Sequence, residues 1–267
     1  MKILCPTDFS NCSVNACRWA AQFLDTLGGG QLELLNCLNI VSRSEMFIKL
    51  DDIYQERAEE DLSELIKTLQ EISSAVVITA KVVKAAPKYF LPDYLKHNDF
   101  DFVVTGTKGL TALKDMTVGS VTAHLMDRSE VPVLAIPSNS VYAPVKQLVM
   151  GVDNQTQVKK GALAPLVKLL ERSAAQLQVV HTLNAEESAS ELHPDIAAEL
   201  VGVNYEFSNI SANNAIAQAL TQFCYSKEAD ILVLLHRQRH WWERLFYNSF
   251  TKSSLFEIEL PFLIISV

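Results

Sequence analysis

The sequence predicts an α/β fold made of two similar lobes in tandem, and three observations support this. Short apolar segments with strand character alternate along the chain with segments of helical periodicity. The apolar segments are nearly continuous, which is typical of parallel strands buried on both faces. Four of them recur in the same order in the second half of the chain, which indicates an internal repeat. Ligands of such sheets bind beyond the carboxyl ends of the strands.

The repeat defines the expected domains. One offset in residue number carries Ile3–Asp8 onto Leu148–Asp153, and Leu32–Asn39 onto Leu177–Asn184. We call it the longer offset. A shorter offset carries Asp101–Val104 onto Asp230–Val233, and Val131–Ile136 onto Leu260–Ile265. The second copy is therefore shorter in its middle than the first. We expect domains over residues 1–138 and 145–267, joined by a polar, proline-flanked stretch.

The first lobe is expected to open with a strand, a helix and a second strand. Residues 2–7 are apolar and favour a β-strand, and Ser10 is a suitable N-cap for the helix that follows. Apolar residues recur in that helix at Val14, Cys17, Ala21 and Leu24. Three consecutive glycines from Gly28 end it before a strand over residues 32–38.

Six further elements complete the first lobe. An amphipathic helix with an acidic outer face, a weak helix interrupted by Pro92, and a third helix alternate with three strands. The expected helices cover residues 47–69, 88–97 and 119–128, and the expected strands cover residues 76–84, 101–105 and 131–136.

Composition and charge narrow the functional classes. Hydrophobic residues make up 49% of the chain, which is enough for a packed core. The net charge of −8 repels nucleic acid, and the densest basic stretch, Arg237–Arg244, is short and interleaved with aromatic residues. No apolar run is long enough to cross a membrane. We therefore expect neither nucleic acid nor a membrane as a partner.

The cysteines indicate a reducing compartment. The chain has five, an odd number, and none forms a C-x-x-C pair. Most lie in apolar patterns, which favours buried thiols over a disulfide framework. The sequence opens directly on strand-like residues with no signal-peptide pattern. We expect a cytoplasmic protein.

The segment Gly106–Ser120 carries the clearest functional signal. It follows a buried strand and leads into a helix, whose free N–H groups and dipole favour an anion near Gly119 and Ser120. Gly106 and Gly109 permit a positive φ and a close approach of the backbone to a ligand. Hydroxyls of Thr107 and Ser120 and the charge of Lys108 or Lys114 can add to this cradle. The pattern predicts a phosphate site.

The spacing G-x2-G-x9-G-S, complete at Gly106, Gly109, Gly119 and Ser120, resembles the ATP-binding pattern of the universal stress protein family. Residues 6–10 resemble that family's opening strand with its aspartate, and residues 131–137 its closing strand. The resemblance covers the chain as a tandem of two such domains, closely in the first copy and loosely in the second. It implies five-stranded parallel sheets of order 3-2-1-4-5, as in the adenine-nucleotide alpha-hydrolase-like fold, with helices on both faces.

The resemblance also implies a ligand and a set of contacts. ATP, with or without Mg²⁺, would lie between the ends of strands one and four. Asp8, beside Pro6 and Thr7, would contact the ribose or adenine, and Cys37 and Leu38 would form a wall for the adenine. The ribose and phosphates would be held by Gly106, Thr107, Lys108, Gly109, Gly119, Ser120 and Val121. The strands at 131–136 and 260–266 would pair within the chain.

The second copy departs from this pattern. The shorter offset replaces Gly106, Gly109 and Gly119 by Leu235, Gln238 and Asn248, and only the serine persists, as Ser249. Side chains at these positions occupy the space of the phosphates, so we expect no ATP there. The aromatic cluster Trp241–Phe250 is interpreted as a filling of the vacated pocket, as packing between lobes, or as a surface for an apolar ligand or protein.

The functional prediction is a nucleotide-binding signalling protein whose occupancy biases assembly or partner binding under stress, with a protein partner or a homo-oligomer left open. One alternative is slow ATP hydrolysis or self-phosphorylation at Ser120 or Thr107, although the sequence offers no base or magnesium carboxylate beyond Asp8. Another alternative is a nucleotide-free scaffold whose glycines only make turns. Near His236 and His240 only Glu243 could be a further metal ligand, and the neighbouring arginines would repel a cation, so no metal site is assigned. No catalytic residue is assigned either.

Overall fold

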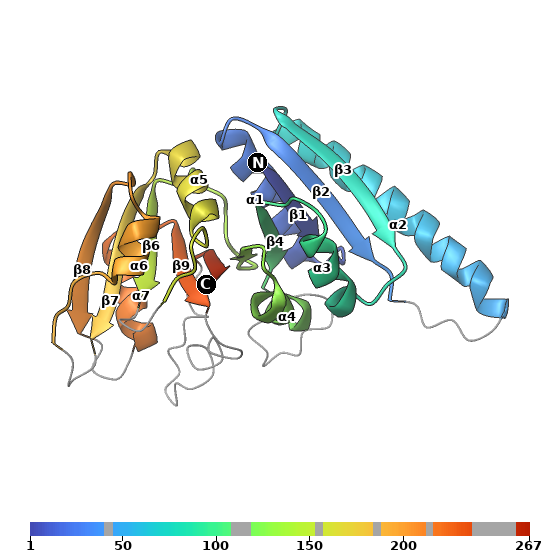
Figure 1. Cartoon of the computed structure of the whole chain (residues 1–267). Helices are drawn as coiled ribbons and strands as arrows, with labels where there is room; N and C mark the ends of the chain where they lie inside the picture. Colours follow the sequence, from blue (N-terminus) through green and yellow to red (C-terminus); the bar gives the residue numbers. More distant parts are fainter. Residues whose placement is uncertain (40–44, 108–118, 153–156, 184–187, 212–215, 237–259) are drawn as a thin grey trace. The chain divides into compact units, whose positions relative to one another are not determined.

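The computed structural model describes residues 1–39, 45–107, 119–152, 157–183, 188–211, 216–236 and 260–267. The chain divides into two compact units, Met1–Tyr142 and Ala143–Val267, which are called the first and second lobe below. Each lobe is an α/β unit and is described by itself (Figure 1).

The sheet of the first lobe is parallel throughout and has the strand order β3-β2-β1-β4-β5. This confirms the expected order 3-2-1-4-5. Its elements are β1 (Lys2–Pro6), α1 (Asn11–Thr26), β2 (Gly30–Cys37), α2 (Glu45–Ile72), β3 (Val76–Val83), α3 (Pro87–Lys96), β4 (Phe102–Gly106), α4 (Ser120–Arg128) and β5 (Val133–Ile136).

Helices cover both faces of this sheet. Because crossovers between parallel strands are right-handed, a chain that moves outward from β1 to β3 and then returns to β4 places its later helices on the opposite face. Accordingly α1 packs against α2, and α3 packs against α4. Strand β4, which pairs with the central strand β1, is buried at every residue, as its continuous apolar run predicts.

The second lobe repeats this strand order as β8-β7-β6-β9-β10, again with parallel pairs. Its elements are β6 (Gln147–Val152), α5 (Ala164–Ser173), β7 (Gln176–Leu183), α6 (Pro194–Glu199), β8 (Tyr205–Ser211), α7 (Ile216–Ser226), β9 (Ile231–His236) and β10 (Phe262–Ser266).

The pairing register of the strands is the same in both lobes. The longer and the shorter offset of the sequence repeat together carry each central pair of the first sheet onto a pair of the second. The corresponding pairs are Ile3–Leu32 with Leu148–Leu177, and Ile3–Phe102 with Leu148–Ile231. The repeat read from the sequence is therefore a repeat of backbone geometry as well.

An aspartate at the start of the fourth strand is part of this repeat. Asp101 accepts a hydrogen bond from the amide of Lys2 at 2.8 Å, and Asp230 accepts one from the amide of Gln147 at 2.9 Å. In both lobes the carboxylate caps the amide that opens the central strand. This explains why the matched segments share an aspartate before their apolar run.

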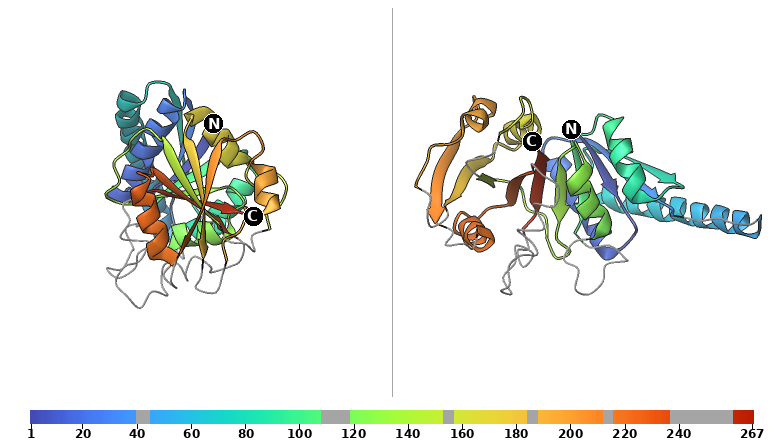
Figure 2. Two further views of the ribbon diagram at one scale, coloured as in Figure 1. Left: turned by 90° about the vertical axis from the view of Figure 1, so that its left-hand side faces the viewer. Right: turned by 60° about the horizontal axis from the view of Figure 1, so that its bottom comes forward.

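Among the described elements, the second helix differs clearly in length between the two lobes. Helix α2 has 28 residues, whereas α6 has six. At a rise of about 1.5 Å per residue α2 is about 42 Å long, longer than the roughly 26 Å of the eight-residue strand β3. It therefore extends beyond the sheet (Figure 2). The shortening inferred for the second copy falls largely here.

The expected interruption at Pro92 is wrong, because α3 is continuous from Pro87 to Lys96. A proline in a helix removes one hydrogen bond and crowds the carbonyl four residues earlier. Here the helix tolerates this because Leu91 and Leu95 are fully buried and anchor it in the lobe, where it packs against α4. Pro87 occupies the first turn, where proline fits a helix well.

Among the described residues no helix combines the length and the apolar character needed to span a bilayer.

Candidate functional site

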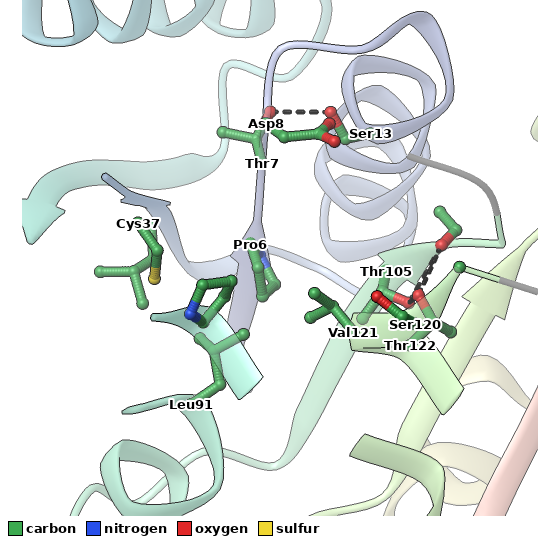
Figure 3. Close-up of a pocket in the computed structure, with 14 residues that line it drawn as sticks. Pro6, Thr7, Asp8, Ser13, Cys37, Leu91, Thr105, Ser120, Val121 and Thr122 are labelled. Carbon is green, nitrogen blue, oxygen red and sulfur yellow. Dashed lines mark hydrogen bonds between the residues drawn. The ribbon is translucent and has the colours of Figure 1, made fainter. Parts of the chain in front are cut away.

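The strand order of the first lobe creates one natural position for a site. From β1 the chain proceeds to β2 on one side, whereas it later returns to β4 on the other side of β1. The crevice beyond the carboxyl ends of two such strands is where open α/β sheets bind ligands. A pocket of about 110 Å³ lies there (Figure 3).

Six elements, β1, α1, β2, α3, β4 and α4, line this pocket together with their adjoining turns. Figure 3 shows Asp8 and Ser13 at one end, Cys37 and Leu91 on one side, and Ser120 and Val121 on the other. The volume is below the roughly 300–1,000 Å³ of typical ligand pockets. Residues 108–118, which connect β4 to α4 and thus adjoin this pocket in the chain, lie outside the described residues.

Hydroxyl groups fix the turn between β1 and α1. The Thr7 Oγ1 accepts a hydrogen bond from the amide of Phe9 at 3.1 Å and lies 3.0 Å from the Ser13 Oγ. Ser10 caps α1 as expected, because its hydroxyl accepts from the Ser13 amide at 3.2 Å. These bonds hold the turn in the tight shape that carries Asp8.

The carboxylate of Asp8 lies at the mouth of the pocket. One of its oxygens accepts a hydrogen bond from the Ser10 amide at 3.1 Å, and the residue is exposed. Asp8 therefore has the turn-capping role that a strand-end aspartate commonly has. It also lines the pocket, so a second carboxylate oxygen can face a ligand.

On the opposite side, α4 directs its first turn at the pocket. Gly119 is its N-cap, with φ of −64°, and Ser120, Val121 and Thr122 follow as its first residues. The N–H groups of these three residues have no acceptor within the helix, and all three residues line the pocket. Together with the positive end of the helix dipole they favour an anion.

Two threonines fix α4 to the sheet. The Thr122 hydroxyl donates to the carbonyl oxygen of Gly106 at 2.8 Å and lies 2.9 Å from the Thr105 hydroxyl. All three groups are buried. The helix N-terminus is therefore held at the end of β4, so its donors are already in place before a ligand arrives.

The remaining wall is apolar. It is formed by Pro6, Leu35, Cys37, Pro87 and Leu91. Burial raises the pKa of the Cys37 thiol to about 11, so the thiol is neutral near pH 7 and adds no charge. An apolar wall facing a cluster of hydroxyls and N–H groups suits a ligand with a flat apolar part and an anionic part.

The role expected for Gly106 needs correction. Its φ is not positive, and a Cβ at this position would lie 2.8 Å from the carbonyl oxygen of Cys12 and 2.7 Å from its sulfur. The glycine therefore allows α1 to approach β4. It lines the pocket, but the close backbone approach that it permits is to Cys12.

Two predicted contacts lie outside the pocket lining. The amide of Thr107 donates to the Ile136 carbonyl at 3.0 Å, and the amide of Leu38 donates to the Val83 carbonyl at 2.8 Å. Both amides are thus used in extending the sheet. The Thr107 carbonyl in turn accepts from the Gly119 amide at 2.5 Å. The main-chain donors of Thr107 and Gly119 themselves are therefore not available to a ligand, whereas those of the first turn of α4 have no acceptor within the helix.

Of the twelve predicted site residues, the pocket brings together Pro6, Thr7, Asp8, Cys37, Gly106, Gly119, Ser120 and Val121. Lys108 and Gly109 lie outside the described residues. Sequence reasoning missed Ser13, Leu35, Pro87, Leu91, Thr105 and Thr122. Strand alternation would have found Leu35 and Thr105, since they share a sheet face with Pro6. The docking of α3 has no comparable local signal.

The equivalent positions of the second lobe are apolar. The shared register places Val152 where the first lobe has Thr7, Leu234 in place of Thr105, and Leu235 in place of Gly106. All three side chains are buried. The hydroxyls that line the first pocket therefore have no counterpart at these positions.

Side chains also occupy the corresponding space. Gly151 is equivalent to Pro6, and a Cβ there would lie 3.4 Å from methyl carbons of both Leu220 and Leu234. Helix α5 begins at Ala164, later in the repeat than Asn11, where α1 begins. The leucine that replaces Gly106, Leu235, accounts for the later start of α5, because its side chain leaves no room for helical turns equivalent to the first turns of α1. Trp241–Phe250 and His240 lie outside the described residues.

Comparisons with known proteins agree with this geometry. The family model described as the universal stress protein family matches residues 1–137. A universal stress protein from Archaeoglobus fulgidus aligns over 99% of this chain and 98% of its own, with 19% identity and a TM-score of 0.71. This likeness shows that the fold extends over both lobes.

Two further solved structures align with about one lobe. A universal stress protein from Lactobacillus plantarum covers 51% of this chain and 96% of its own, with 22% identity and a TM-score of 0.45. A universal stress protein in complex with cAMP covers 51% and 96%, with 23% identity and a TM-score of 0.39. No curated protein matches the chain.

Proposed function

The chain belongs to the universal stress protein family, and we propose that its first lobe binds one adenine nucleotide, with ATP as the expected ligand. One observation carries this proposal. The pocket at the ends of β1 and β4 lies between the first-turn N–H groups of α4, which have no acceptor within the helix, and the exposed carboxylate of Asp8. Anion donors on one side and an acceptor for hydroxyl groups on the other match a nucleotide.

Each part of the ligand has a matching part of the pocket. Phosphate oxygens would accept hydrogen bonds from the amides that open α4 and from the Ser120 hydroxyl. Ribose hydroxyls would donate to Asp8, and the base would lie along the wall formed by Cys37 and Leu91. The described lining contains one carboxylate, so Mg²⁺, when present, would depend mainly on phosphate oxygens and water.

We propose a structural or partner-binding role for the second lobe, as a degenerate universal stress protein domain. Its support is the replacement of polar pocket positions by Val152, Leu234 and Leu235, together with the leucines packed over Gly151. A nucleotide would meet buried methyl groups at these positions and would leave its polar groups unpaired.

The proposed setting is a stress-response signalling protein of the cytoplasm. All five cysteines are free thiols, which supports a reducing compartment. Nucleotide occupancy would bias the binding of a protein partner or self-association. α3 and α4 both line the pocket, so a ligand there can alter the surface that these helices present.

Self-phosphorylation is a second candidate, and the structure favours one acceptor. Ser120 is exposed and lines the pocket, whereas Thr107 is buried and lies outside its lining. Asp8 is the one carboxylate of the described lining that could assist hydrolysis or transfer. Mass spectrometry after incubation with ATP and Mg²⁺ decides this candidate, because an unmodified chain without formation of ADP excludes it.

Isothermal titration calorimetry with ATP tests the proposed binding function. We expect about one site per chain, with affinity reduced about tenfold or more by Asp8→Asn, since a hydrogen bond to a charged group contributes about 1.5–3 kcal/mol. Asp153→Asn is the matched control, because the repeat offset carries Asp8 onto Asp153, and it should leave the affinity unchanged. Absence of any heat from ATP, together with an unchanged melting temperature, would favour the nucleotide-free scaffold.

A second variant, Gly119→Val, tests the anion side. The N-cap backbone, with φ of −64° and ψ of 146°, is accessible to valine, so the fold should persist. The branched side chain would stand at the opening of α4 and should abolish binding of ATP. Circular dichroism confirms that the variant is folded, and undiminished binding to it would contradict the assignment.

A further inference from the structure

A second hollow lies on the first lobe, between α3 and α4, which pack side by side (Figure 1). Its volume is about 500 Å³, larger than that of the pocket at the ends of β1 and β4. Residues of α3, residues of α4 and Glu130 line it, and none of them lines the first pocket. We call this hollow the α3/α4 groove.

Three cationic side chains line the groove and form no salt bridge among the described residues. Lys88, Lys96 and Arg128 are exposed, and within the described part of the chain none has a carboxylate oxygen within 4.0 Å. The lining also includes Asp93, but that carboxylate lies 3.5 Å from the Nδ1 of His97 outside the groove. A chain of net charge −8 thus leaves three cations unpaired in one place.

The field of these cations reaches the interior of the groove. His124 lines it at a half-buried position on α4, one turn before Arg128. Burial lowers the pKa of His124 from its ordinary value of 6.5, the positive charges of Arg128 and Lys88 lower it further, and Asp127 opposes this. The balance around the imidazole is therefore positive, and a carboxylate placed there would be attracted.

The groove also offers an apolar contact. Tyr89 is 81% exposed on α3, and Pro92 lies one turn further along the same helix. An exposed aromatic ring beside a proline commonly packs against an apolar side chain of a partner. Glu130 and Asp93 add negative charge to the lining, which disfavours a uniform polyanion such as nucleic acid.

We propose that the α3/α4 groove docks an acidic peptide segment of a partner protein. Carboxylates of the segment would pair with Lys88 and Arg128, and an aliphatic or aromatic side chain would lie against Tyr89 and Pro92. The mixture of cations, an aromatic ring and two carboxylates fits a peptide better than a phosphate polymer, since peptides carry both charge and apolar groups. Docking itself requires no nucleotide, so it can fail or succeed independently of the proposed nucleotide function.

Solution NMR of the whole chain tests this proposal. The probe is a short synthetic peptide in which glutamates alternate with leucines, and the control peptide carries glutamine in place of every glutamate. We expect the acidic peptide to shift the amide signals of α3 and α4 and the ring signals of His124, in a salt-dependent manner. The glutamine peptide should bind several-fold more weakly.

Charge reversal locates the site. The double variant Lys88→Glu/Arg128→Glu should weaken binding of the acidic peptide by about tenfold or more. The matched control is Arg57→Glu/Lys67→Glu on α2, which changes the net charge equally at exposed positions of a different helix, and it should lose less than about twofold. Tyr89→Ala should produce a smaller loss than the double reversal.

Three results would overturn the proposal. The acidic peptide could fail to shift any signal of α3 or α4, or both double variants could weaken binding equally, which would indicate a response to net charge alone. In the third result, a single-stranded oligonucleotide shifts the same signals and displaces the peptide. This would assign the groove to nucleic acid. Titration of the same sample with ATP reports separately on the nucleotide pocket.

Discussion

Gly106 of β4 and Cys12 of α1 approach each other so closely that no side chain fits between them. A Cβ on Gly106 would lie 2.7 Å from the Cys12 sulfur and 2.8 Å from its carbonyl oxygen. The first turn of α1 therefore packs directly on the end of β4. This contact fixes the β1–α1 turn, and with it Thr7, Asp8 and Ser13, beside α4.

Gly106→Ala should consequently destabilise the first lobe. The added methyl group meets backbone atoms that cannot rotate away, and overpacking of this kind costs about 1–3 kcal/mol. Urea unfolding followed by circular dichroism measures the free energy of unfolding. A variant with unchanged stability that loses only ATP binding would instead support the reading in which Gly106 serves the ligand.

Cys37 provides a chemical probe of the pocket. It is half-buried, whereas the other four cysteines are buried, and this partial burial raises the pKa of its thiol from 9.0 to about 11. At neutral pH its thiolate fraction is therefore about a hundredfold lower than that of an ordinary cysteine. We expect slow alkylation of Cys37 by iodoacetamide, faster as the pH rises toward 11.

Saturating ATP should slow this alkylation further, because the nucleotide would cover the thiol. Peptide mapping by mass spectrometry identifies the modified cysteine, and Cys37→Ser should leave the native chain almost unlabelled. Rapid labelling of Cys37 that ATP does not change would place the nucleotide elsewhere.

Because His124 lines the α3/α4 groove, we predict that the affinity of the groove for an acidic peptide depends on pH. Burial lowers the pKa of the free imidazole below 6.5, and Arg128 on its own helix and Lys88 on α3 add to this shift. Carboxylates of a docked peptide would raise the pKa, so docking takes up a proton in the interval between the two pKa values. Affinity for the acidic peptide should thus increase as the pH falls from about 7 to about 5.5.

The His124→Gln variant should remove this dependence, and NMR titration of the His124 ring measures both pKa values directly. A pKa in the free chain above 6.5, or one that the peptide lowers, contradicts the account. Asp93, Asp127 and Glu130 are the carboxylates near this part of the groove, and their presence limits the size of the effect.

The sheet could be predicted from the sequence because its determinants are local and repeated. Continuous apolar runs marked the strands, and the longer offset carried the register of Ile3 with Leu32 onto Leu148 with Leu177. The strand order came from the family resemblance. The continuity of α3 through Pro92 was not predictable, because the burial of Leu91 and Leu95, a tertiary effect, outweighs the local cost of a proline.

The site was predictable where residues stand next to a motif. Asp8 follows a strand and Ser120 opens a helix, so their positions at the carboxyl edge of the sheet follow from the order of elements. The roles of Gly106 and Thr107 were not predictable, because a glycine that admits a neighbouring helix has the same local signature as one that admits a ligand. Leu91 enters the pocket only through the docking of α3, which is a tertiary contact.

Native mass spectrometry of the intact chain equilibrated with ATP tests the central claim most directly. A single added nucleotide per chain that disappears in Gly119→Val is the predicted result, because among the described residues the helix opening beside an aspartate lies in the first lobe, at α4 and Asp8. Two nucleotides per chain, or none at concentrations that saturate the calorimetric titration, would contradict a single functional pocket.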